Sequence, residues 1–385
     1  MKHPTRCMLW GGYGCGNVGD ELALAIALRD MQGSFGDSVA VLSRVPGYTK
    51  ALFPSVKVLA YTPSTGRPPA APNLMTRIGR RLRRRVPPPW LRFDPQEQLQ
   101  SKESRGWAQA IRDCEILYLV GGGYLTDVFD YEYLLAPVEL AQFSGVPIAT
   151  APLGIGPFRR PANGRRVRNA LRGALVKVRD EDSLSTCRRL GMVVEHHPDD
   201  GFRVREAMEL RVPARANNGR VGVNFYPQHG ATNHEAARKW WQAVVRELHT
   251  AGFALEGFCF HNAWQADFEQ TVRLFVDAGL PAEQVRWPDW DYREACRQLL
   301  DYQCIVTARF HAAVVAGAAG IPTIAVADGP YYQPKMAAAS ADRARSRAVH
   351  WDEVEPRTVV DWVKAWMGAG NDVRQRGSGP QTKTG

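Results

Sequence analysis

Short apolar runs alternate with amphipathic stretches through the first half of the chain. The runs that predict buried strands lie at 7–10, 39–42, 56–60, 116–120 and 147–151. The amphipathic stretches that predict helices lie at 19–31 and 131–143. Strands that alternate with helices in this way are typical of parallel sheets built from βα units.

The same alternation begins again near Arg220. The predicted strands of this second series lie at 221–226, 253–260, 304–308 and 323–327, and its predicted helices at 233–249, 265–278, 310–320 and 356–367. A polar, turn-rich stretch at 203–220 separates the two series. We therefore predict an N-terminal Rossmann-like domain at 1–205, a linker at 206–219, a C-terminal Rossmann-like domain at 220–367 and a disordered tail at 368–385.

Length and charge agree with this division and point to the kind of partner. A chain of 385 residues, 45% of them hydrophobic, is too long for one compact core and suits two domains. Its formal net charge of +10 favours anionic partners, such as phosphates, acidic sugars or a membrane surface. We expect no nucleic-acid partner, because no recognition motif for nucleic acid is present.

The seven cysteines are scattered, and no two of them have CxxC spacing. This pattern favours a reducing compartment over a disulfide framework or a zinc site. No stretch has the length and apolar character of a signal core or a membrane span, so we expect a cytoplasmic protein.

An arginine-rich insertion at 73–95 interrupts the first series. Leu74, Ile78 and Leu82 recur at four-residue spacing among arginines, so a helix at 74–90 would have one apolar face and an otherwise basic surface. That pattern is typical of a helix that lies on an anionic membrane surface, and a peripheral membrane contact is one interpretation. A solvated, charged loop is the alternative.

A glycine-rich turn at 11–21 follows the first predicted strand. Gly14, Gly16 and Gly19 have the GxGxxG spacing of a dinucleotide site. The second predicted strand, however, leads into Ser43 and Arg44 instead of the acidic residue that binds an NAD ribose. An NAD-dependent oxidoreductase is therefore disfavoured.

Polar side chains crowd the same turn. Asn17, Asp20 and Glu21 would repel or obstruct a pyrophosphate, and the two carboxylates can instead face sugar hydroxyls and accept their protons. Helix capping is the alternative role for Asp20. Asp127, which ends the glycine-rich stretch 121–127, can likewise bind a hydroxyl or cap the next helix.

Cationic side chains follow other predicted strands. Arg179 comes at the end of an apolar segment, where a guanidinium can bind a carboxylate or phosphate, or form an internal salt bridge. Arg309 and His311 lie at the turn between a strand and a small-residue helix, which favours an anion pocket with a group that titrates near neutral pH. Lys335 lies downstream and can add a third cation.

The order of these motifs resembles the polysaccharide pyruvyl transferase family over roughly residues 10–335. The matching segments are GGYGCGNVGDE, GGGYLTD, GIGP, VRDEDS, HPDDGF and ARFHAAVVAGAAGIP, with Lys335 beyond them. The resemblance implies a glycosyltransferase-B-like fold, phosphoenolpyruvate as donor and a pyruvate ketal on a sugar as product. It places the donor on Arg179, Arg309 and His311, and the acceptor at the glycine-rich N-terminal motif.

We therefore hypothesise a pyruvyl transferase that needs no cofactor or metal and uses phosphoenolpyruvate as co-substrate. His311 would be the acid, kept protonated by the donor phosphate, and Asp20 or Glu21 the base. The donor would bind to Arg179, Arg309, His311 and Lys335, and a sugar or lipid-linked oligosaccharide acceptor to Gly14, Gly16, Asn17, Asp20, Glu21 and Asp127. A nucleotide-sugar glycosyltransferase of the same fold and a non-catalytic sugar- or membrane-binding module are the alternatives.

Overall fold

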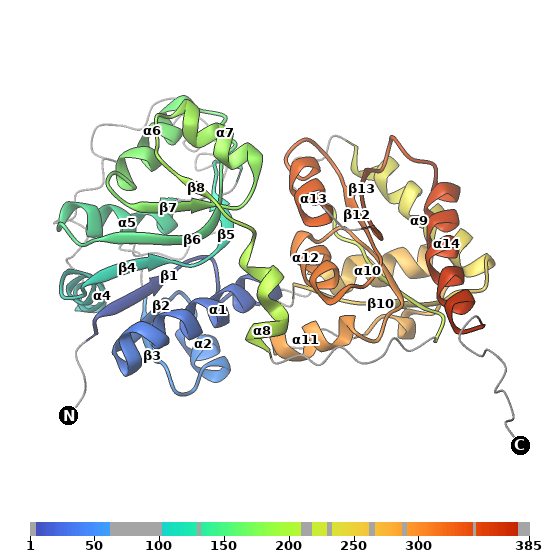
Figure 1. Ribbon diagram of the computed structural model, residues 1–385, viewed down its shortest axis with the longest axis horizontal. Coiled ribbons are helices and arrows are strands. Elements are labelled where there is room, and N and C mark those ends of the chain that lie inside the picture. The colour runs from blue at the N-terminus through green and yellow to red at the C-terminus, as the bar shows by residue number, and fades with distance from the viewer. Residues whose placement is uncertain are drawn as a thin grey trace, which may run out of the picture.

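The computed structural model describes residues 5–61, 102–128, 132–208, 218–228, 233–261, 266–286, 291–341 and 344–375. Within these ranges the chain forms two α/β units that lie side by side (Figure 1). The predicted pair of Rossmann-like domains with parallel sheets is confirmed. The arginine-rich insertion at 73–95 and the segment 376–385 lie outside the described residues.

The first unit is built on a sheet of eight parallel strands. The strands are β1 (Cys7–Trp10), β2 (Val39–Ser43), β3 (Lys57–Ala60), β4 (Ile116–Leu119), β5 (Gly122–Leu125), β6 (Ile148–Ile155), β7 (Leu175–Val178) and β8 (Glu195–His196). Their order is β3-β2-β1-β4-β6-β7-β8, and β5 pairs with β6. The core strands β1 and β2 are buried at every position, as expected for a sheet that is covered by helices on both faces.

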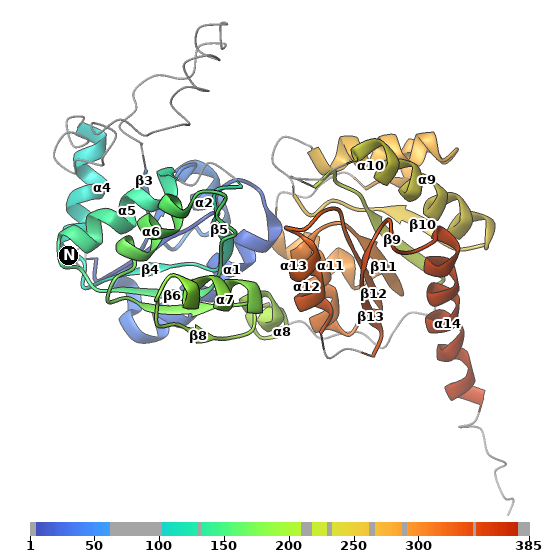
Figure 2. The ribbon, with the colours of Figure 1, turned by 90° about the horizontal axis from the view of Figure 1, so that it is seen from above.

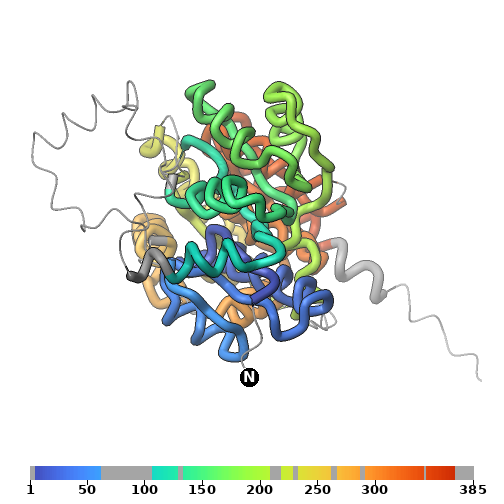
Figure 3. Tube along the Cα trace, turned by 90° about the vertical axis from the view of Figure 1, so that its left-hand side faces the viewer, coloured from blue at the N-terminus to red at the C-terminus, as the bar shows by residue number. Residues whose placement is uncertain are grey.

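Helices connect the strands of the first unit and cover its sheet. They are α1 (Val18–Phe35), α2 (Pro46–Leu52), α4 (Lys102–Arg112), α5 (Glu132–Phe143), α6 (Pro161–Ala170), α7 (Glu181–Arg189) and the short α8 (Val204–Ala207). Seen from the first unit, the early elements (blue) lie at one end of the sheet and α6 and α7 (green) at the other (Figure 3).

The second unit holds a five-stranded parallel sheet in the order β10-β9-β11-β12-β13. Its strands are β9 (Arg220–Asn224), β10 (Ala254–Gly257), β11 (Cys304–Thr307), β12 (Thr323–Ala327) and β13 (Ser346–His350). Its helices are α9 (His234–Thr250), α10 (Ala266–Asp277), α11 (Tyr292–Leu299), α12 (Phe310–Ala319), α13 (Gln333–Ser340) and α14 (Pro356–Gln375). None of the helices described is long and apolar enough to cross a membrane.

Helix α14 lies at the far end of the second unit, away from the first (Figure 2). It continues to Gln375, past the predicted end at Met367, so the prediction of disorder was wrong for residues 368–375. That prediction rested on the composition of the stretch 368–385, which is rich in glycine and polar residues. A glycine costs a helix roughly 1 kcal/mol relative to alanine, which weakens a helix without ending it.

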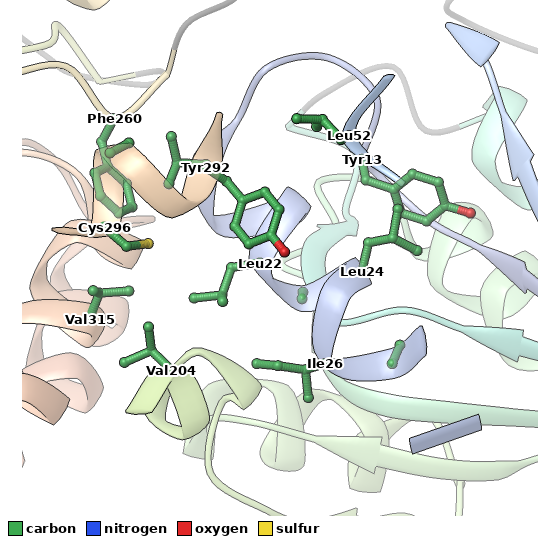
Figure 4. Packing of buried hydrophobic residues seen from close by; sticks show 14 of the residues in the cluster. Tyr13, Leu22, Leu24, Ile26, Leu52, Val204, Phe260, Tyr292, Cys296 and Val315 are labelled. Carbon is green, nitrogen blue, oxygen red and sulfur yellow. The ribbon is translucent and has the colours of Figure 1, made fainter. Parts of the chain in front are cut away.

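A hydrophobic cluster joins the two units. Helix α1 of the first unit packs its Leu22 among Val204 of α8 and Tyr292, Cys296 and Val315 of the second unit (Figure 4). The backbone continues this contact, because the N–H of Val18 donates to the carbonyl of Phe260 over 3.2 Å. These contacts hold the carboxyl ends of the two sheets against each other, where ligands bind to open α/β sheets.

Candidate active site

A cavity of about 330 Å³ lies where the two units meet. Six of the predicted site residues line it: Asn17, Asp20, Arg179, Arg309, His311 and Lys335. The first three come from the first unit and the other three from the second. The cavity therefore brings together the cationic side chains predicted at separate strand ends.

Arg179 follows β7 directly and is almost fully buried. Its Nη1 donates to Oδ2 of Asp199 over 2.7 Å, and its Nε lies 3.8 Å from Oδ2 of Asp180. Burial works against the guanidinium charge, but Asp199 and Asp180 outweigh it and raise the pKa of Arg179. Its planar group lies over the Phe310 ring at 4.5 Å. These contacts fix the orientation of a permanent cation at the cavity wall.

His311 lies in the first turn of α12 and reaches the same cluster. Its Nε2 is 3.4 Å from Nη1 of Arg179 and 3.9 Å from Oδ2 of Asp199. Burial, followed by the charges of Arg179, Lys335 and Arg309, lowers its pKa to about 4, although Asp199 opposes this shift. The imidazole is therefore neutral at pH 7 in the free protein, and the predicted protonated form requires an anion beside it.

Arg309 precedes α12 and is held by an acidic residue that the sequence prediction missed. Its Nε donates to Oδ1 of Asp267 over 3.0 Å, and its Nη2 contacts the same oxygen. Asp267 is fully buried in α10, where Oδ2 also accepts the backbone N–H of Phe260. The guanidinium lies over the Tyr226 ring at 3.7 Å. Nothing in the pattern of α10 distinguishes Asp267 from an ordinary acidic residue in a first helical turn.

Lys335 brings a third cation into the cavity. A Cβ placed on Gly123 would lie 2.6 Å from Nη2 of Arg179 and 2.9 Å from Nζ of Lys335, so both cations approach the backbone of β5 at one point. Burial and then the Arg179 charge lower the pKa of Lys335 well below its usual value. An anion bound between the two cations would relieve this repulsion.

Asp20 faces the cations across the cavity. Its Oδ2 accepts a hydrogen bond of 2.8 Å from Nδ2 of Asn17. Burial raises its pKa to about 6, against the opposing effect of Arg179. A carboxylate with this pKa can accept the proton of a hydroxyl near neutral pH.

The comparisons with known proteins identify the family. A family model described as "Polysaccharide pyruvyl transferase" matches residues 17–330, which include every one of these cavity groups except Lys335. The chain belongs to the polysaccharide pyruvyl transferase family. No protein of curated function matches the sequence.

Solved structures with the same fold are distant from this member of the polysaccharide pyruvyl transferase family. A putative UDP-N-acetylglucosamine 2-epimerase from Listeria monocytogenes has a TM-score of 0.58 at 11% identity, with coverage of 95% of this chain and 88% of the other. A Rickettsia africae glycosyltransferase has a TM-score of 0.54 at 9% identity, covering 95% and 89%. Anabaena HepE in complex with UDP and glucose has a TM-score of 0.54 at 13% identity, covering 94% and 89%. These likenesses confirm the glycosyltransferase-B-like fold alone.

The structure places other predicted acceptor residues away from this cavity. Glu21 is fully buried, and its Oε1 accepts the N–H groups of Gly14 and Gly16 over 2.8 and 3.2 Å. These contacts contradict the predicted roles of Glu21 as base and of the two glycines as acceptor ligands. Glu21 instead holds the glycine-rich turn, where both glycines have positive φ angles of 82° and 73°.

Asp127 is also a structural residue. Its carboxylate accepts the backbone N–H groups of Arg159 and Arg160 over 2.7 and 3.0 Å and the side-chain amide of Asn163 over 2.9 Å. It therefore binds the start of α6, the helix after the next strand, and the acceptor role predicted for it was wrong. The alternative role as an N-cap is not seen either, because the N–H groups that its carboxylate accepts belong to Arg159 and Arg160, which precede α6.

Asp199 is the second residue that the sequence prediction missed. It begins the short 3₁₀ turn at Asp200–Arg203, and its Oδ1 accepts the N–H of Gly201 over 2.8 Å while its Oδ2 holds Arg179. Its position in the segment HPDDGF, after the last strand of the first sheet, is the signal that could have identified it. Across the described ranges, no His, Cys, Asp and Glu side chains gather in a group that could hold a metal ion.

Proposed function

We propose that this protein transfers the pyruvyl group of phosphoenolpyruvate to a sugar of a polysaccharide, or of its lipid-linked precursor, as a cyclic ketal. The observation that carries the proposal is the meeting of Arg179, Arg309 and Lys335, from both units, around His311 and opposite Asp20. Phosphoenolpyruvate carries a carboxylate and a phosphate on three carbons. Its charges match a compact set of buried cations.

Donor binding would change the protonation state of His311, the proposed acid. The free imidazole of His311 is neutral because burial and three neighbouring cations lower its pKa. A phosphate dianion beside the imidazole offsets the charges of those cations and raises the pKa of His311. Donor binding therefore favours the protonated ring, which can supply the proton that the reaction needs. Arg179 and Lys335, which approach each other at Gly123, are placed to hold the phosphate.

The proposed reaction then proceeds in four steps. His311 donates its proton to the methylene carbon of phosphoenolpyruvate, and the central carbon becomes electrophilic. The oxygen of an acceptor hydroxyl bonds to that carbon, and Asp20 accepts the hydroxyl proton. The bond between that carbon and the bridging phosphate oxygen breaks, phosphate leaves with the electron pair, and Asp20 passes its proton to the phosphate. A second hydroxyl of the same sugar bonds to the carbon, closes the ketal and gives its proton to His311.

Donor binding tests this proposal without knowledge of the acceptor. Calorimetric titration of the wild-type protein should detect phosphoenolpyruvate, and Arg309→Ala should weaken that binding at least tenfold. Arg347→Gln is the matched control, because Arg347 also lies over an aromatic ring, that of Trp362, but outside the cavity. Binding of UDP or UDP-N-acetylglucosamine instead of phosphoenolpyruvate would favour a nucleotide-sugar glycosyltransferase. Binding of neither would favour a non-catalytic module.

A further inference from the structure

Arg44 is a cation of the cavity that the proposed donor chemistry does not use. It follows β2 directly, beside the glycine-rich turn that follows the neighbouring strand β1, and it lines the cavity together with Cys15, Asn17 and Asp20. Its guanidinium carbon lies 4.4 Å from the centre of the Tyr133 ring. The ring restrains a long side chain that would otherwise be mobile.

No carboxylate of the described residues forms an ion pair with this guanidinium within 4.0 Å. The other two cavity arginines differ, since Arg179 is paired with Asp199 and Arg309 with Asp267. The Nε atom of Arg44 is buried and has no hydrogen-bond partner there. A buried donor on a charged group costs free energy unless a ligand satisfies it. The arrangement is therefore incomplete without an anion.

Phosphoenolpyruvate is not the anion that we expect Arg44 to bind. Arg179 and Lys335 meet over Gly123, and their pKa values respond to each other and to Asp180 and Asp199. Arg44 instead lines the cavity together with Cys15, Asn17 and Asp20, and its charge lowers the pKa of Asp20 against the larger effect of burial. Arg44 thus belongs to the side of the cavity where the acceptor hydroxyl must lie.

A dinucleotide phosphate is not the anion either. An arginine after the second strand of a Rossmann unit can bind the 2′-phosphate of such a cofactor. The pyrophosphate of the same cofactor, however, needs N–H groups of the glycine-rich turn. Here Glu21 already accepts those of Gly14 and Gly16.

We propose that Arg44 selects an acceptor that carries a negative group, a carboxylate or a phosphate, on or next to the sugar that receives pyruvate. The negative group would bind to the N–H groups at the outer edge of the Arg44 guanidinium, while the Tyr133 ring packs against the face of the same guanidinium. This inference rests on the proposed pyruvyl transfer, because it assigns the Asp20 side of the cavity to the acceptor. It adds a charge requirement that the donor chemistry does not contain.

Pairs of simple glycosides that differ only in charge can test the inference. Saturation-transfer NMR would compare methyl glucuronide with methyl glucoside, and the same pairs in the galacto and manno series, on the wild-type protein and on Arg44→Gln. Glucose 6-phosphate would test whether a phosphate can replace the carboxylate as the negative group. We expect the charged member of at least one pair to bind the wild-type protein about tenfold more tightly, as one charge-assisted contact provides. Arg44→Gln should abolish this preference, Arg44→Lys should keep part of it, and Arg347→Gln should leave it unchanged.

The outcomes separate the two proposals. Equal binding of the charged and neutral members of every pair by the wild-type protein would overturn the inference, as would a preference that survives Arg44→Gln. If Arg44→Gln weakened phosphoenolpyruvate binding by more than about threefold, Arg44 would be assigned to the donor site, and the inference would also be overturned. Failure of the wild-type protein to bind phosphoenolpyruvate would refute pyruvyl transfer instead. The glycoside comparison is made without donor and does not depend on that result.

Discussion

The backbone of Gly19 lies directly against the imidazole of His311. A Cβ atom added at Gly19 would lie 2.0 Å from Cγ and 2.1 Å from Nδ1 of that ring, so no side chain fits at this position. Gly19 is the third glycine of the GxGxxG pattern. In a dinucleotide-binding protein that glycine allows a helix to pack closely on a strand. Here its absent side chain makes room for the imidazole of His311 in the opposite unit.

Gly19→Ala should therefore disable the site while leaving each unit folded. The methyl group must displace His311 or push the two units apart, because the ring cannot share its space. We expect phosphoenolpyruvate binding to weaken at least tenfold and phosphate release to fall by about a hundredfold. Gly33→Ala is the control in the same helix, since a Cβ there meets nothing within 4 Å. It should keep full activity and stabilise the helix at this exposed position by up to about 1 kcal/mol.

Asp267 holds Arg309 in the cavity, and its loss should reduce donor binding. Asp267→Asn leaves a neutral group that can still accept the N–H of Phe260 but no longer pairs with the guanidinium. We expect the KM for phosphoenolpyruvate to rise about tenfold and the free energy of unfolding to fall by about 1–3 kcal/mol. Asp277→Asn, which removes an exposed partner of Arg238, should change neither quantity by much. Equal effects of the two substitutions would show that Asp267 has no particular role at the donor site.

Periodicity predicted most of the fold. Strands β1, β2, β4, β11 and β12 were all found within one residue of their predicted ends, because buried parallel strands are continuous apolar runs bounded by turns. The strand β5 was missed because its sequence, GGYL, has the composition of a turn. It pairs with β6 through backbone atoms that no side-chain pattern marks.

Three of the cavity residues were predictable because they lie where a strand ends. Arg179, Arg309 and His311 lie at strand ends, and parallel topology brings those ends together. Glu21 is adjacent to Asp20 but points into the core, because successive helical side chains are about 100° apart and only one of the two can face the cavity. The partner Asp267 was not predictable from pattern, since its importance arises from a contact between distant parts of the chain. The position of Asp199 after the last strand of the first sheet was a usable signal, although its pairing with Arg179 was not visible in the sequence.

Donor binding should take up a proton at His311. The pKa of the free imidazole is lowered to about 4, so at pH 7 it is unprotonated, and the bound phosphate must raise that pKa for the ring to act as acid. A complex that holds a proton more tightly than the free protein loses affinity as pH rises. We expect calorimetry in buffers of different ionisation enthalpy to detect an uptake of up to about one proton, and the affinity for phosphoenolpyruvate to fall between pH 6 and pH 8. His311→Gln should abolish the uptake, and an unchanged uptake would assign the proton to another group.

Asp20 should lower stability at neutral pH. Its folded-state pKa of about 6 lies above the ordinary value of 3.8, so folding favours its protonated form. The charged form destabilises the fold above that pKa, and the effect disappears as pH falls toward 4. Asp20→Asn should therefore raise Tm by roughly 2–4 °C at pH 7.5 and leave it unchanged at pH 4. The same variant should release phosphate slowly, and a variant that is fully active would exclude Asp20 as the base.

Asp127 should affect stability without affecting the donor site. Its carboxylate accepts the backbone N–H groups of Arg159 and Arg160, just before α6, and its loss leaves both donors without this partner. We expect Asp127→Ala to lower the free energy of unfolding by about 1 kcal/mol, as the loss of a typical hydrogen bond does. Asp127→Asn should recover part of that loss, because its amide oxygen can accept one of the two bonds. Neither variant should change the affinity for phosphoenolpyruvate by more than about twofold. A larger change in affinity, measured by calorimetric titration, would show that Asp127 contributes to donor binding and would contradict its purely structural role.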